Sequence, residues 1–319
     1  MKKTIDPIRF EVIRNAFTEA TEEMSAALKR SAFSTNIKTR CDFSCSFFDY
    51  NLRPIAQAFG QPNHLGSMVQ TVRYGVTQYG MENIQEGDGI MTNHPYNGGV
   101  HLNDIALISP VVYQGKTMGY VANLAHHVDV GGGAPASIGA FKEVYQEGVI
   151  IPAVKFMQNW KVVDDVFNLI LAQVRAKRET SGDFRAQIAA NSTGIRRVTD
   201  LLNMYGADEM DYYMNAIVDY TDERTGQEFA KFPHGVYEAE GYIDNDGYTD
   251  KPVLLKVMVT INADGITCDF TGSDPQRKAP VNATYAMTYS AVAFVLHCLI
   301  DSDVSKNQGF DQQIKLIAT

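Results

Sequence analysis

The sequence contains few cysteines, and they are widely scattered. Its 319 residues include four, at Cys41, Cys45, Cys268 and Cys298. They form no CxxC pair and no recurrent spacing, so neither a disulfide framework nor a zinc site built from thiolates is expected. We expect isolated buried thiols in a reducing cytosol.

The sequence also lacks a hydrophobic run long enough to cross a bilayer. Its longest apolar window, residues 285–300, is interrupted by Thr, Ser and His, and it is too short to span the hydrocarbon comfortably. The opening stretch MKKTIDPIRFEVIRNAF has two lysines but no apolar run after them, as a signal peptide would have. These features predict a cytoplasmic protein and a core helix at 285–300.

An excess of positive charge is missing as well. The formal net charge is −9 and the isoelectric point is near 5.3. Nucleic acids and anionic membranes bind basic surfaces, so we expect neither as a partner. With 45% hydrophobic and 20% charged residues, the composition is that of an ordinary globular protein with ample material for a core.

Hydrophobic periodicity predicts helices and hairpins in alternation. Asp6 before Pro7 is typical of a helix N-terminus, and a long amphipathic helix is expected over 7–33. One hairpin is expected around residues 49–51, and another with Gln114-Gly115 at its turn.

The rest of the chain continues this alternation. Further helices are expected over 65–81 and over 164–230, the latter broken near 179–183 and 205–209. Hairpins with Asn-Asp-Gly and Ala-Asp-Gly turns follow, and a helix over 283–301, apolar almost all round, is expected to be buried.

This order of elements predicts the fold class. Hairpins imply antiparallel pairing, so we expect an α+β fold rather than a doubly wound α/β fold. We divide the chain into a metal-site α+β region (1–160), a helical region (161–232) and a region of hairpins plus a buried helix (233–319). Because the sequence stops at GFDQQIKLIAT, just as a strand begins, we expect it to be the first part of a longer polypeptide.

Histidines are concentrated in one part of the chain. Five of the seven fall between residues 64 and 127, at His64, His94, His101, His126 and His127. In GGVHLND, a tight turn between His101 and Asp104 would bring both side chains to one point, although an H-x-x-D pair also occurs by chance.

Two further acids accompany the paired histidines. Neighbouring strand residues face opposite ways, so only one of His126 and His127 should reach a site shared with His101. Asp129 could orient the inward imidazole by accepting its second N–H. Asp42 enters a hydrophobic strand, where a carboxylate is costly unless it is paired or metal-bound; a turn residue at the strand end is the alternative.

Two His and two Asp would make a nitrogen and oxygen site. Such a set suits Zn, Mn or Fe, and an open position would let the metal polarise a carbonyl or activate water. The backbone N–H groups of Gly131, Gly132 and Gly133 could hold an oxyanion, with a flexible loop as the alternative. This glycine run lacks the GK[ST] and G-x-G-x-x-G patterns of nucleotide sites, so we expect no ATP site in this chain.

Five blocks of sequence together resemble the hydantoinase B/5-oxoprolinase family. They are RCDFSCSFFD, NHPYNGGVHLNDIALISPVVYQGK, AHHVDVGGGAPAS, GDFRAQIAAN and DFTGSDPQ. The resemblance runs in order from residue 7 to 319. Relatives include N-methylhydantoinase B, the matching half of 5-oxoprolinase, caprolactamase subunits and the metal-bearing subunits of acetone and acetophenone carboxylases.

The resemblance assigns roles to individual residues. The metal ligands it implies are Asp42, His101, Asp104 and His126. His127 and Asp129 then fall to catalytic, substrate-facing or supporting roles. The sequence departs from the family pattern at His94, where an Asp commonly precedes the proline, but this position is none of the implied ligands.

The resemblance also implies a two-component, ATP-dependent enzyme. A hydantoinase A-like ATPase subunit would phosphorylate the amide, and the metal subunit would then open a cyclic amide such as a hydantoin, oxoproline or a lactam. One alternative is the metal subunit of an ATP-dependent ketone carboxylase, and another is a metal-free structural subunit. A hetero-oligomer acting on a small molecule is expected.

Overall fold

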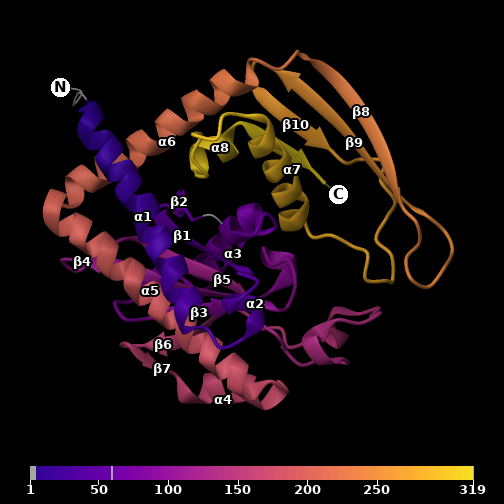
Figure 1. Ribbon diagram of the computed structural model, residues 1–319, viewed down its shortest axis with the longest axis horizontal. Coiled ribbons are helices and arrows are strands. Elements are labelled where there is room, and N and C mark those ends of the chain that lie inside the picture. Colours follow the sequence, from indigo (N-terminus) through magenta and orange to yellow (C-terminus); the bar gives the residue numbers. More distant parts are fainter. Residues whose placement is uncertain (1–4, 59, 319) are drawn as a thin grey trace.

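A seven-stranded sheet organises the first half of the chain in the computed structural model, which describes residues 5–58 and 60–318 (Figure 1). Its strands are β1 (Phe43–Asp49), β2 (Pro54–Gln57), β3 (Gly89–Thr92), β4 (Asp104–Tyr113), β5 (Lys116–His126), β6 (Val154–Gln158) and β7 (Lys161–Val162). They lie in the order β2-β1-β5-β4-β3-β6-β7, and each neighbouring pair is antiparallel. The expectations for the first four residues and for Thr319 concern positions outside the described residues.

Helices cover both faces of this sheet (Figure 1). They are α1 (Pro7–Ser31), α2 (Thr35–Lys38), α3 (His64–Tyr79), α4 (Asp164–Gln173), α5 (Lys177–Tyr205) and α6 (Ala207–Phe229), with short 3-10 turns at Met81–Asn83, Pro95–Asn97, Pro135–Ser137 and Val144–Gln146. Alternate residues of β5 serve the two cores: Val121 and Ala125 pack with α1, α5 and α6, whereas Ala122 and Leu124 pack with α3. This alternation follows from the period of two along a strand.

A second, smaller sheet follows α6 in the chain (Figure 1). It contains β8 (Gly235–Ile243), β9 (Val253–Asn262), β10 (Gly265–Asp269) and β11 (Ile314–Ile317), with α7 (Tyr285–Leu299) and α8 (Gln308–Gln312) between the last two strands. β8, β9 and β10 pair antiparallel, but β10 and β11 are parallel. The α+β class is confirmed, with one parallel pair among the hairpins.

Most of the expected elements are present. Asp6 caps α1 by accepting the N–H of Ile8 at 3.0 Å, and the hairpins β1–β2 and β4–β5 form as predicted. At the turn of the second hairpin, Gln114 and Gly115 have φ of 50° and 77°. Two successive residues with positive φ form a turn whose twist matches that of the strands, which explains the glycine.

The predicted helix break at 179–183 is wrong. α5 runs through these residues, and the chain instead breaks between α4 and α5, at residues 174–176. A Cβ on Gly182 would lie 2.3 Å from the ring of Phe33, so this glycine permits a close contact between segments and does not end the helix. The expected break near 205–209 is present at Gly206.

The burial predicted for helix 283–301 is correct for one side only. In α7, Ala286, Ser290 and Ala293 are buried, whereas Val295 and Leu299 are 55% and 61% exposed. An all-apolar sequence therefore did not imply burial all round. Within the described residues, no helix combines the length and the apolar character needed to cross a membrane.

Candidate metal centre

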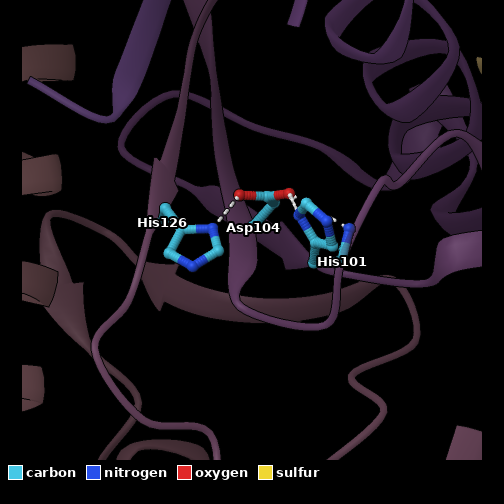
Figure 2. Close-up of side chains that lie close together, drawn as sticks. All are labelled: His101, Asp104 and His126. Atoms are coloured by element: carbon cyan, nitrogen blue, oxygen red, sulfur yellow. Dashed lines mark hydrogen bonds and ion pairs between the residues drawn. The ribbon is translucent and has the colours of Figure 1, made fainter. Parts of the chain in front are cut away.

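Two adjacent strand ends bring an acid and an imidazole together. Asp104 is the first residue of β4 and His126 is the last of β5, and the two are directly opposite each other in the antiparallel register. Residues so paired have their side chains on the same face of the sheet. In Figure 2 the carboxylate of Asp104 lies between the rings of His126 and His101.

A tight turn places His101 at the other side of the same carboxylate. The Asp104 N–H donates to the His101 carbonyl at 3.1 Å, and the His101 N–H donates back to Asp104 Oδ2 at 3.0 Å. His101 Nδ1 lies 3.1 Å from Oδ2, and His126 Nδ1 lies 2.8 Å from Oδ1. The turn expected between His101 and Asp104 is therefore present.

These three residues form the one group of acidic, histidine or cysteine side chains, among the described residues, that could hold a metal ion. Their donor atoms all lie within 4.8 Å of one another. The set comprises two nitrogens and a carboxylate without sulfur, which suits Zn, Mn or Fe.

The charges at the centre also suit a cation. Asp104 is completely buried. Burial alone would raise the pKa of its carboxyl, but the interactions with His101, His126 and His64 hold it well below its usual range. The pKa of His101 is raised, chiefly by its hydrogen bond to Asp104, although burial acts to lower it. The negative charges of Asp104, Asp42 and Glu147 raise it further. A buried anion ringed by imidazoles fits a divalent ion, since buried charges are paired or metal-bound.

Asp42 lies beside this group but is not a member of it. Its carbonyl accepts the N–H of His126 at 2.9 Å, which ties the start of β1 to the end of β5. Its carboxylate acts on His101 through charge, yet it is not among the donors that lie within 4.8 Å of one another. Its assignment as a fourth ligand stays a prediction.

His127 faces the opposite side of the sheet from His126. Its ring is completely buried; its Nε2 lies 3.0 Å from Gln187 Oε1 on α5, and its centroid lies 4.7 Å from that of Phe184. Burial lowers the pKa of His127 against the charge of Asp183. The predicted catalytic role of His127 is untested by this geometry, which shows a ring enclosed by helix α5.

Asp129 and the glycine run are tied to Arg175. The Asp129 carboxylate accepts the main-chain N–H of Arg175 and pairs with its guanidinium at 3.1 Å. The same guanidinium donates to three carbonyls of the loop. The N–H of Gly131 donates to Asp129 at 3.3 Å, and that of Gly133 donates to the carbonyl of Gln146 at 2.7 Å. The oxyanion role predicted for Gly131, Gly132 and Gly133 would require two of these groups to change partners.

Sequence reasoning gave His64 no role. The structure places its Nε2 3.7 Å from Asp104 Oδ1, with both side chains fully buried. The one signal in the sequence was that His64 lies in the histidine-rich part of the chain, residues 64–127. No local pattern linked a residue at the start of α3 to the start of β4.

Comparisons with known proteins show similarity along nearly the whole chain. The family model described as Hydantoinase B/oxoprolinase matches residues 6–319. An uncharacterised protein of Methanocaldococcus jannaschii is 40% identical over 317 residues, covering 98% of this chain. 5-Oxoprolinase 1 of Arabidopsis thaliana is 34% identical over 329 residues, covering 95% of it. The crystal structure of an ATP-dependent caprolactamase from Pseudomonas jessenii superposes with a TM-score of 0.92 at 29% identity and covers 99% of the chain.

The matched proteins are considerably longer. The chain spans 56% of the Methanocaldococcus protein, 26% of the plant 5-oxoprolinase and 55% of the caprolactamase chain.

Proposed function

The chain belongs to the hydantoinase B/oxoprolinase family, and from this premise we propose that it carries the metal centre of an ATP-dependent enzyme that hydrolyses a cyclic amide. The substrate class is a hydantoin, oxoproline or a lactam. ATP binds to a hydantoinase A-like partner, which activates the amide, so the working enzyme is a hetero-oligomer. The names of the relatives support this class, because oxoproline and caprolactam are both cyclic amides.

The observation that carries the proposal is the buried Asp104 carboxylate between two imidazoles. Its donors and those of His101 and His126 lie within 4.8 Å of one another, and these residues would hold the metal, with Asp42 as the fourth ligand. A divalent metal acts as a Lewis acid toward a carbonyl oxygen and also lowers the pKa of water.

The exposure of the three side chains sets the direction from which substrate approaches. The side chain of Asp104 is 0% exposed, that of His126 is 17% exposed and that of His101 is 57% exposed. Asp104 therefore anchors the centre from beneath, and His101 borders the open side where an amide can enter.

His127 and Asp129 support the centre from behind in this proposal. His127 fills the space between the end of β5 and α5 through its contact with Gln187, and Asp129 anchors the following loop through Arg175. Both contacts restrain the chain just beyond His126. Their contribution to turnover is then the restraint of that ligand and of the loop facing substrate.

The test uses the protein purified with its ATPase partner, measuring bound metal by elemental analysis and ATP-dependent ring opening of hydantoins and lactams. His101→Ala and Asp104→Asn should each lower metal content at least about 10-fold, because each removes a ligand, and abolish ring opening while the partner's basal ATPase remains. His234→Ala, a change at an exposed histidine, is the matched control and should alter neither. Full metal content in the His101 variant, or fixation of labelled bicarbonate onto a ketone in place of ring opening, would contradict the proposal.

A further inference from the structure

One fully buried imidazole beside the metal centre has an unmet hydrogen bond. His64 begins α3 and is 0% exposed. Its Nδ1 lies 3.1 Å from the hydroxyl of Ser44 on β1, but its Nε2 has no hydrogen-bond partner. Buried polar atoms in proteins are almost always paired, so this nitrogen calls for an explanation.

The group that faces the unpaired nitrogen is the carboxylate of Asp104. His64 Nε2 lies 3.7 Å from Asp104 Oδ1, which is longer than a hydrogen bond by about 0.7 Å. A carboxylate that binds a metal is deprotonated and can only accept. An N–H on Nε2 is therefore the favourable tautomer, and it leaves Nδ1 free to accept from the Ser44 hydroxyl.

His64 lies outside the set of residues that could share an ion. The donor atoms of His101, Asp104 and His126 lie within 4.8 Å of one another, and His64 is not a member of that group. His64 lies at the start of α3, whereas His126 ends β5 and His101 lies in the turn before β4. His64 therefore contacts Asp104 and not the ion. Any effect of His64 on the ion passes through the Asp104 carboxylate.

We propose that His64 is a positioning residue that donates its Nε2–H to Asp104 Oδ1 when Asp104 binds the metal, with Ser44 fixing the tautomer. The inference rests on the proposed function. A ring nitrogen that binds a metal carries no proton, so His126 would no longer donate to Oδ1 if its Nδ1 held the ion. The Nε2–H of His64, which faces the same oxygen, then takes over and orients the carboxylate. Outer partners of this kind typically change metal affinity about 10–100-fold.

The test is a titration of metal-stripped protein with Co²⁺, whose visible absorption reports both affinity and coordination. His64→Leu should bind Co²⁺ about 10–100-fold more weakly with an unchanged band shape. His64→Gln, which keeps a donor, should recover most of the affinity. His234→Leu is the matched control at an exposed position and should match the unmodified protein.

Ser44→Ala provides an independent test in case the His64→Leu protein misfolds. Ser44 is fully enclosed but bonds His64 rather than Asp104, so losing its hydroxyl should weaken Co²⁺ binding without touching a ligand. Melting temperatures in EDTA report folding separately. Affinities within about 2-fold of the unmodified protein in both His64→Leu and Ser44→Ala would overturn the inference. So would a changed Co²⁺ band in His64→Leu, because it would make His64 a ligand. If the unmodified protein bound no Co²⁺, the proposed function itself would fail.

Discussion

Asp311 should make the protein less stable as the pH rises, and replacing it by Asn should remove that effect. Asp311 lies on α8, where the hydroxyl of Tyr289 donates to its Oδ1 at 2.8 Å. Burial raises the pKa of its carboxyl from 3.8 to about 6, although the Tyr289 bond and the charge of Arg73 both oppose this. The folded protein thus holds this proton more tightly than the unfolded chain does.

The size of the effect follows from the two pKa values. A group whose folded pKa is raised above its unfolded value destabilises the fold as the pH rises between the two values, here from about 4 to about 6. A difference of about 2 corresponds to about 3 kcal/mol. Since Asp311 is only partly buried, solvent screening reduces this, and about 2 kcal/mol is expected.

The assay is urea unfolding of the unmodified protein and of Asp311→Asn in EDTA, at several pH values from 4 to 8. Asn keeps an oxygen that can accept from Tyr289, so the two proteins should have similar unfolding free energies at pH 4. The variant should be more stable by about 2 kcal/mol at pH 7. Contributions from groups that do not contact Asp311 cancel in this comparison, so the pH-dependent part of the difference reports Asp311.

A matched control is Asp303→Asn, which removes a carboxylate from an exposed position in the nearby loop. This variant should not reproduce the gain in stability expected for Asp311→Asn at pH 7. If the Asp311→Asn difference were the same at pH 4 and pH 7, the reasoning from burial would be wrong.

Two further predictions concern the residues behind the metal centre. His127→Ala should lower the unfolding free energy by about 2–4 kcal/mol, because it leaves a gap beside Phe184 and removes the partner of Gln187 Oε1. Metal content should stay unchanged. Thermal melts and elemental analysis check the two expectations, and a loss of metal would be the contrary result. Arg175→Met should free the glycine loop, since each lost charge-assisted hydrogen bond is worth about 1.5–3 kcal/mol. The protease Lys-C should then cut after the exposed Lys142 about 10-fold faster or more. Equal cleavage rates in the two proteins would show that Arg175 does not restrain the loop.

Local patterns predicted much of the fold correctly. The cap at Asp6, the turn at Gln114-Gly115 and the α+β class depend on neighbouring residues, and all are observed. The errors arose where a distant contact overrides a local signal. Gly182 breaks a helix by propensity, but Phe33 requires a small residue there. Leu299 belongs to an apolar helix, yet it is 61% exposed because no described segment covers that side.

The candidate site shows the same division. The glycines and the H-x-x-D spacing in GGVHLND predicted the turn that joins His101 to Asp104, because its hydrogen bonds connect residues three apart. The alternation of a strand was enough to predict that His126 and His127 face opposite sides. Both conclusions needed only backbone geometry over a few residues.

Tertiary structure decided which groups surround the Asp104 carboxylate. The β4–β5 register sets His126 opposite Asp104, the docking of α3 brings His64 to the same carboxylate, and α5 encloses His127. Register and docking depend on how whole cores pack, and packing sums many weak contacts between segments far apart in the chain. No window of sequence contains those contacts, so a short motif can nominate ligands while the folded sheet and helices determine what surrounds them.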